Sequence, residues 1–113
     1  MNGGAAESVW RPAADRYATP EAVVIEVDVP GAKREAVRVT LERGELLVEA
    51  PISEPEGDVV GAAVVRGRYR RSFLVPEDVD GAAVRARLSA GVLRVTLPKV
   101  ERTPARTVEI EEG

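Results

Sequence analysis

Apolar and polar residues alternate along most of this chain, which is the pattern of β-strands that bury one face. From residue 23 to 29 an apolar side chain recurs at every second position, and Pro30-Gly31 then ends the run. Residues 37–42 and 46–50 repeat the pattern on either side of Arg43-Gly44, which predicts a tight hairpin turn. The positions expected on the buried faces are Val23, Ile25, Val27, Val29, Val37, Val39, Leu41, Leu46, Val48 and Ala50.

The second half of the chain carries three more alternating runs, at residues 69–75, 84–88 and 93–97. In the first of them Arg71 falls on the same face as Tyr69 and Phe73. Many short strands at close spacing, separated by Gly and Pro, predict an all-β fold in which two antiparallel sheets form a sandwich. Residues 29–37 and 78–84 each have room for one helical turn at most.

The loop between Pro51 and Gly67 starts polar, with two prolines, and becomes apolar further along. A loop without structure has no need of such valines, so we expect an extra strand inside it. Its apolar members are Val59, Val60, Val64 and Val65.

A last short alternation stands near the C-terminus, where Val108 and Ile110 lie on one side of an extended run and Glu109 on the other. This segment is too short to form a sheet alone. It either packs on another surface or frays as a chain end with incidental apolar residues.

Composition narrows the choice of function. The chain has 113 residues, enough for one domain with a modest core. It contains no Cys and no His, which excludes disulfides, thiolate nucleophiles and imidazole ligands. A net charge of −3 argues against a nucleic-acid binder. No apolar run approaches the ~20 residues of a membrane span, and the N-terminus does not read as a secretory signal, so we expect a cytoplasmic protein.

Enzymatic function is not expected either. No glycine-rich loop followed by Lys and Ser or Thr is present. Asp78–Gly81 is reminiscent of a calcium-binding loop with Gly81 at its sixth position. Pro76 would then stand at the first position and Arg87 at the twelfth, where calcium needs carboxylate ligands, so the segment does not fit a calcium site. We therefore expect no catalytic residues, cofactor or metal.

The segment "ARLSAGVLRVTLPK" resembles the signature of the small heat-shock proteins, the α-crystallin family. The matching residues are Ala86, Gly91, Val92, Leu93, Val95, Leu97, Pro98 and Lys99. Four further segments resemble the same family in the expected order, namely the entry segment "WRPAADRYAT", then "VDVPGAKREAVRVTLERGELLVEA", "GRYRRSFLVPEDVD" and the tail motif "VEI". The resemblance covers roughly residues 10 to 110. One departure is Ala90, which is poorly suited to a turn that needs positive φ.

The resemblance implies an immunoglobulin-like sandwich of the α-crystallin type over residues 14–100, a short N-terminal arm over 1–13 and a C-terminal tail over 101–113. It implies that Val108 and Ile110 dock into an edge groove of another subunit, although docking within the same chain stays open. The residues expected to wall this groove, which would take a tail or a client, are Val37, Val39, Leu41, Val84, Ala86 and Leu88.

The resemblance also implies a dimer. It places the characteristic arginine of the family on Arg71, at or near the subunit interface and paired with acidic groups; the alternative is that strand twist carries Arg71 into solvent. The valines of the 51–67 loop would add a strand to the partner subunit, or else fold back on their own sheet. Arg68 and Arg70 have the opposite parity and are expected on a solvated face.

The function implied by the resemblance is that of an ATP-independent holdase, which binds unfolding proteins and prevents their aggregation. One alternative is an assembly partner that dimerises and joins a longer-armed paralogue, with little client binding of its own. Another is a cochaperone of the CS-domain type, which the tail motif and Arg71 disfavour. Because the segment "MNGGAAESV" offers few large apolar side chains, we expect weak holdase activity. The expected partners are further copies of the chain, unfolding clients and paralogues, without nucleic acid or membrane.

Overall fold

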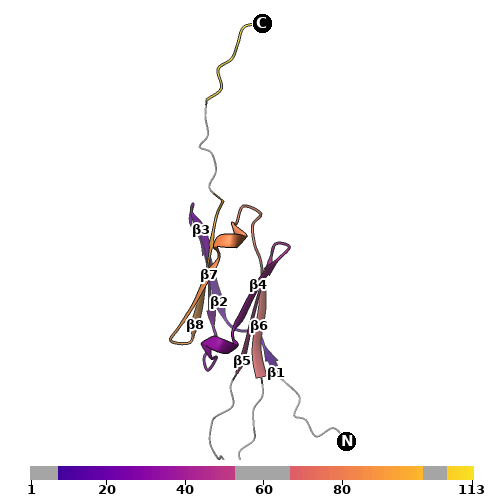
Figure 1. The fold of residues 1–113 in the computed structure, drawn as a ribbon, viewed down its shortest axis with the longest axis vertical. Coiled ribbons are helices and arrows are strands. Elements are labelled where there is room, and N and C mark those ends of the chain that lie inside the picture. The colour runs from indigo at the N-terminus through magenta and orange to yellow at the C-terminus, as the bar shows by residue number, and fades with distance from the viewer. Residues whose placement is uncertain (1–7, 53–66, 101–106) are drawn as a thin grey trace, which may run out of the picture.

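The structure, a computed structural model, describes residues 8–52, 67–100 and 107–113, and it shows two four-stranded sheets that face each other (Figure 1). One sheet has the order β1 (Ser8–Trp10), β6 (Gly67–Leu74), β5 (Glu45–Ile52) and β4 (Arg38–Glu42). The other has the order β2 (Ala14–Ala18), β3 (Ala22–Asp28), β8 (Val92–Pro98) and β7 (Arg85–Ser89). The predicted all-β sandwich is confirmed.

The expected helical turns are present as two 3-10 turns, η1 (Arg34–Ala36) and η2 (Gly81–Ala83). Each links a strand of one sheet to a strand of the other. Asp80 caps η2, because its Oδ1 accepts a hydrogen bond of 3.1 Å from the backbone N–H of Ala82.

Neighbouring strands are antiparallel within both sheets, except that β1 runs parallel to β6. The edge strands are therefore β1 and β4 in one sheet, and β2 and β7 in the other. Edge strands present backbone N–H and C=O groups that no neighbour in the same sheet satisfies. The position of these edges decides where another segment can be added.

The core lies between the sheets and is almost entirely aliphatic, because Phe73 is its one aromatic member among the described residues. The alternation predicted from the sequence holds in β3, β5 and β8, where every second side chain is buried. The buried core consists of Val23, Ile25, Val27, Val29, Leu46, Val48, Ala50, Phe73, Leu93, Val95 and Leu97.

Two hairpin turns fix the register of this core. Arg43 and Gly44 link β4 to β5 with φ of 50° and 76°, and Ala90 and Gly91 link β7 to β8 with φ of 49° and 77°. Positive φ at both central residues matches the twist of the flanking strands. Ala90 thus adopts the conformation that the sequence analysis considered unfavourable for it, and the strands on either side hold it there.

Strand β1 was not predicted from the sequence. Its Trp10 ring packs against the Tyr69 ring with centroids 5.8 Å apart. A Cβ atom on Gly67 would come within 3.2 Å of the Trp10 ring and 3.1 Å of the Ser8 carbonyl oxygen, so only glycine leaves room for β1 at this place.

Candidate functional site

A groove opens between the two sheets where the edge strands β4 and β7 lie, with a volume of about 530 Å³. Its apolar lining comes from both edges and from the first buried position of β8. The lining residues are Arg34, Val37, Val39, Ala86, Arg87, Leu88 and Leu93. The structure therefore brings together Val37, Val39, Ala86 and Leu88, four of the six residues that the resemblance assigned to a groove.

The other two, Leu41 and Val84, are half-buried and pack against the core rather than lining the groove. Along β4 the exposure alternates, so that Val39 and Leu41 turn inward between exposed Arg38, Thr40 and Glu42. On β7 Leu88 is half-buried, and the other residues of the strand are exposed. Since no further strand covers these inward residues at the edge, the groove follows from strand periodicity and the ends of the two sheets.

The family-signature residues hold the far wall of the groove in place. Gly91 has positive φ, and a Cβ added to it would lie 3.4 Å from Cα of Pro30. Its carbonyl oxygen accepts a hydrogen bond of 2.8 Å from the N–H of Val29, which joins the β7–β8 turn to the end of β3. Val92 opens β8, Leu93 enters both core and groove, and Pro98 ends the strand.

Two arginines at the rim of the groove were not identified from the sequence. Arg34 comes from η1 and Arg87 from β7, and both side chains are exposed. Arg87 could have been found from the sequence, because it alternates with Ala86 and Leu88 along β7 and shares its side of the strand with Arg85. Apolar side chains and two guanidinium groups thus line the groove together.

The C-terminal segment that carries the tail motif lies uncovered in the single chain. Residues 107–113 form no strand, and the side chains of Val108 and Ile110 are 71% and 94% exposed. Exposed side chains of this kind contribute free energy of burial only when they pack against an apolar surface. Their docking partner stays a prediction.

Arg71 lies on the inward side of β6, opposite the buried Val48. Its Nη1 donates a hydrogen bond of 2.9 Å to the carbonyl oxygen of Pro12, and its guanidinium sits 5.1 Å from the centre of the Phe73 ring. Nε is buried without a hydrogen-bond partner. Within the described residues no carboxylate reaches Arg71, so the acidic partner expected from the sequence stays a prediction.

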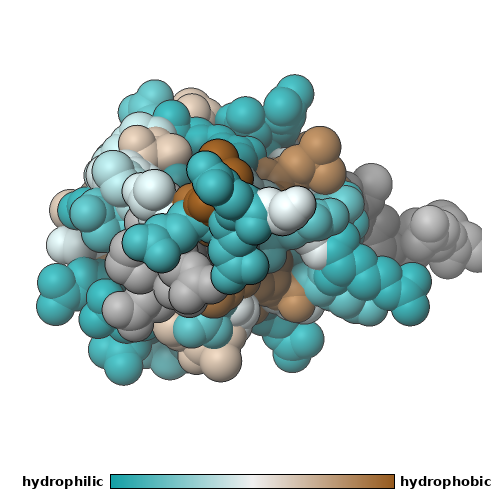
Figure 2. All heavy atoms as spheres, turned by 90° about the horizontal axis from the view of Figure 1, so that it is seen from above, coloured by the Kyte–Doolittle hydropathy of each residue, from teal (hydrophilic) through white to brown (hydrophobic). Residues whose placement is uncertain are grey.

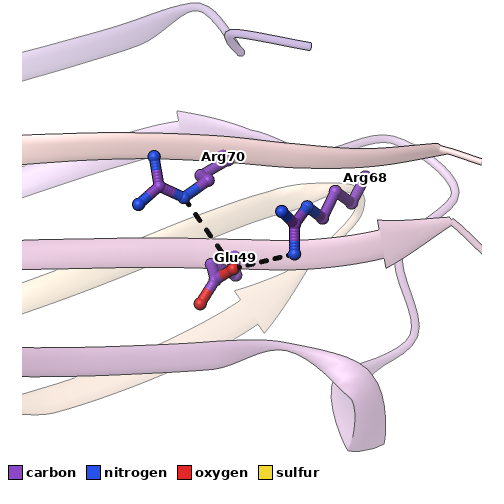
Figure 3. Close-up of polar contacts among 3 residues, drawn as sticks. All are labelled: Glu49, Arg68 and Arg70. Carbon is purple, nitrogen blue, oxygen red and sulfur yellow. Dashed lines mark hydrogen bonds and ion pairs between the residues drawn. The ribbon is translucent and has the colours of Figure 1, made fainter. Parts of the chain in front are cut away.

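Arg68 and Arg70 lie on the outer face of the same strand, as expected. Figure 3 shows both side chains turned toward Glu49 on β5. The Arg68 Nη1 lies 3.2 Å and the Arg70 Nε 3.9 Å from Oε2 of Glu49. One carboxylate thus lies between two guanidinium groups, as on a solvated sheet face with local charge pairing.

The space-filling view from above shows a mostly hydrophilic surface with small hydrophobic patches between charged side chains (Figure 2). Over the described ranges, no group of acidic residues is arranged to hold a metal ion. No helix in those ranges is long and apolar enough to cross a membrane. The loop valines Val59, Val60, Val64 and Val65 fall outside the described residues, so the predicted strand exchange stays a prediction.

Comparison with known proteins gives one consistent family. The profile of the Hsp20/alpha crystallin family matches residues 15–111. The chain is 37% identical to a 16.9 kDa class I heat shock protein from Triticum aestivum, over 97% of this chain and 79% of the relative. It is 30% identical to an 18 kDa antigen from Mycobacterium leprae, over 88% of this chain and 68% of the relative.

Solved structures agree with these sequence matches. HSP18.5 from E. histolytica superposes with a TM-score of 0.69 at 25% identity, covering 89% of this chain and 99% of that one. Heat shock protein 16.0 from Schizosaccharomyces pombe gives a TM-score of 0.67 at 27% identity, covering 91% of this chain and 99% of that one. A small heat-shock protein from Xylella fastidiosa, described as having a distinct high order structure, superposes with a TM-score of 0.68 at 22% identity and 91% coverage, which shows the shared fold.

Proposed function

Because this chain belongs to the Hsp20/alpha crystallin family, we propose that it is an ATP-independent holdase that binds apolar segments of unfolding proteins and keeps them from aggregating. The observation that carries the proposal is the uncovered groove between β4 and β7. Family membership supports a chaperone role in general, and we propose that the groove is the part of this chain that carries it out. We further propose that the protein works in the cytoplasm.

The groove has the properties that an extended client segment requires. Its two borders are edge strands, which offer free backbone donors and acceptors for strand addition. Its inside offers apolar contacts from Val39 and Leu88, which accept alternate side chains of an added strand. An unfolding protein exposes such alternating segments, and their capture prevents them from pairing with one another.

The C-terminal segment would be the resident occupant of this groove, supplied by another subunit. Val108 and Ile110 would each contribute roughly 1.5–3 kcal/mol if fully buried. Ordering the segment and bringing two subunits together offsets much of that gain. The tail would therefore exchange readily, and its departure would uncover the groove for clients.

The proposed building block is a dimer. The exposed edge of β2 is free in the single chain and could accept a strand from the 51–67 loop of a second subunit. Arg71, half-buried with one guanidinium nitrogen unpaired, would meet a carboxylate across that interface. We keep the division into an arm (1–13), a sandwich (14–100) and a tail (101–113) as part of the same proposal, with β1 as the portion of the arm that joins the sandwich.

The test of the proposed function is the heat-induced aggregation of a labile enzyme, followed by turbidity with increasing amounts of this protein. Suppression of turbidity is expected at molar excess, more strongly at higher temperature because more tails have left their grooves. Adding ATP is expected to change nothing. If turbidity develops unchanged even at large excess, while the protein mixes stably into assemblies of a longer-armed relative, then it is an assembly partner and the holdase proposal is wrong.

A further inference from the structure

The outer face of the β2-β3-β8-β7 sheet separates its charges by strand. One row across the sheet runs from Asp15 on β2 to Glu26 on β3, then to Arg94 on β8 and Arg87 on β7. Arg94 and Arg87 are direct cross-strand neighbours, a like-charge arrangement that is unfavourable when nothing compensates it. Arg85 stands two residues before Arg87 on the same side of β7. The row therefore ends in positive charge at an open sheet edge.

These arginines differ from Arg70 of the other sheet, which lies near Glu49. In the part of the chain that the structure describes, no carboxylate forms an ion pair with Arg85, Arg87 or Arg94. Arg94 has only the Tyr17 hydroxyl, to which its Nη2 donates at 3.1 Å. Around them lies a second hollow of about 450 Å³, lined by Arg85, Ala86, Arg87, Arg94 and Thr96. Ala86 and Arg87 border both this hollow and the apolar groove.

A strand added to the free edge of β7 would place its side chains alternately in the apolar groove and over the arginines. The C-terminal segment has that alternation. Val108 and Ile110 share one side, and Glu109 and Glu111 share the other. The two glutamates are two residues apart, as are Arg85 and Arg87, so either strand direction sets each carboxylate opposite a guanidinium.

We propose that Arg85 and Arg87 of one subunit bind Glu109 and Glu111 in the C-terminal segment of another subunit, and that this pairing sets the register of the docked tail. The inference rests on the proposed docking of the tail, and it adds the residues that would fix the register of the docked tail. A slip by one residue would turn the glutamates into the apolar groove and the valine and isoleucine outward, so charge and apolar packing favour the same register.

The pairing has two consequences. Exposed ion pairs weaken as salt screens them, so assembly through the tail becomes salt-sensitive although its anchors are apolar. An extended segment with alternating acidic and apolar residues would also compete for β7 better than a neutral apolar one, because the neutral segment brings no carboxylate to Arg85 and Arg87.

The test uses charge reversal in the full-length chain, with the assembly followed through a dilution series by light scattering. Arg85→Glu with Arg87→Glu, and separately Glu109→Arg with Glu111→Arg, should each move dissociation to about tenfold higher protein concentration. Combining all four substitutions restores opposite charges and should return the midpoint toward that of the parent. Glu21→Arg with Glu77→Arg changes the net charge as the tail reversal does, at two exposed positions outside β4 and β7, and should leave the midpoint unchanged.

Val108→Ala with Ile110→Ala separates this inference from the proposed docking. If that variant dissociates while both charge reversals behave as the parent, the tail docks without the arginines and the pairing is wrong. If the reversals dissociate the assembly but the fourfold swap does not restore it, the effect is general repulsion and the pairing is again wrong. If none of the variants dissociates, the docking of the tail itself is contradicted.

Discussion

At the scale of single residues, Arg71 has two sets of contacts to account for. Within the chain it bonds the Pro12 carbonyl and covers the Phe73 ring, which links the segment before β2 to the core of the other sheet. Its unpaired, buried Nε leaves capacity for one more acceptor. If Arg71 makes contacts both within its own chain and across an interface, its replacement should lower the stability of the subunit and of the dimer.

We predict that Arg71→Ala lowers the melting midpoint and also weakens its dependence on protein concentration. The contacts within the chain contribute about 1–2 kcal/mol, and the loss of a buried partner across the interface adds to this only in the dimer. Melting is measured over a wide range of protein concentrations, with Arg70→Ala on the same strand as the control. A concentration dependence equal to that of the parent would show that Arg71 acts only within its own subunit.

The turn residue Ala90 gives a second prediction at this scale. A residue with a Cβ at φ of 49° is held against a penalty of about 1–2 kcal/mol. Ala90→Gly should therefore raise the free energy of unfolding, by about 0.5–1 kcal/mol after the greater freedom of glycine in the unfolded chain is subtracted. Chemical denaturation measures it. Ser89→Gly, one residue earlier in the extended strand, should do the opposite; stabilisation by both substitutions would contradict the account.

Residue-level prediction from the sequence succeeded where a position is fixed by strand periodicity and failed where a partner is non-local. The alternation placed Val23, Ile25 and Val27 in the core because a side chain on a strand has only two directions to choose from. It placed Arg71 inward for the same reason. It could not identify the Pro12 carbonyl as acceptor, because that contact joins positions 59 residues apart.

At the scale of elements, the open edges of the sheets carry the functional proposals. β4 and β7 border the groove, β2 is the edge proposed to meet a second subunit, and β1 covers the outer edge of β6. The sequence predicted β3 to β8, since each carries an alternation of apolar and polar residues, but it did not predict β2, whose mostly exposed residues show none. It did not predict β1, because three residues are too few to show a period and the parallel pairing depends on the distant Gly67.

The docking of β1 is testable through the single tryptophan of the chain. We predict that Gly67→Val displaces β1, because the new side chain would occupy the space of the Trp10 ring, and that the fluorescence of Trp10 then shifts to the red as the ring becomes hydrated. The matched control is Gly81→Val, where the nearest contact of a Cβ is a leucine methyl at 3.5 Å. Unchanged emission in Gly67→Val would show that Trp10 does not depend on this contact.

The proposed exchange of the loop gives a prediction at the same scale. Deleting residues 53–64 and closing the gap with a short glycine bridge should give folded monomers, since both sheets remain complete without the loop. Sedimentation measures the mass and circular dichroism the β-sheet content. Dimers of parental affinity after the deletion would show that the loop valines are not the dimer contact.

At the scale of the whole molecule, the account joins an apolar groove, an exposed tail and a second subunit. The alternation of apolar and polar residues predicted the sandwich, whereas the groove residues were implied by the family resemblance, and four of the six line the groove. The tail and its receiving surface belong to different subunits in the proposal, so the single chain shows each of them uncovered.

We predict that Val108→Ala with Ile110→Ala lowers the mass of the assembly and leaves the dimer and the β-sheet signal intact. The two truncations remove most of the apolar gain that holds a tail in its groove. Native mass spectrometry gives the distribution of subunit numbers, and Glu112→Gln in the same tail serves as the control. A mass distribution identical to that of the parent would contradict a linking role for the tail.

The central claim is that one groove, between β4 and β7, receives both the tail and the client. The most direct measurement is the aggregation assay repeated with a peptide of residues 106–113, sequence RTVEIEEG, beside a peptide of the same composition in scrambled order. The account predicts that the native peptide reduces the assembly in size and, at the same concentrations, abolishes protection of the client, while the scrambled peptide does neither. Full protection of the client at a peptide concentration that has already displaced the tails would contradict it.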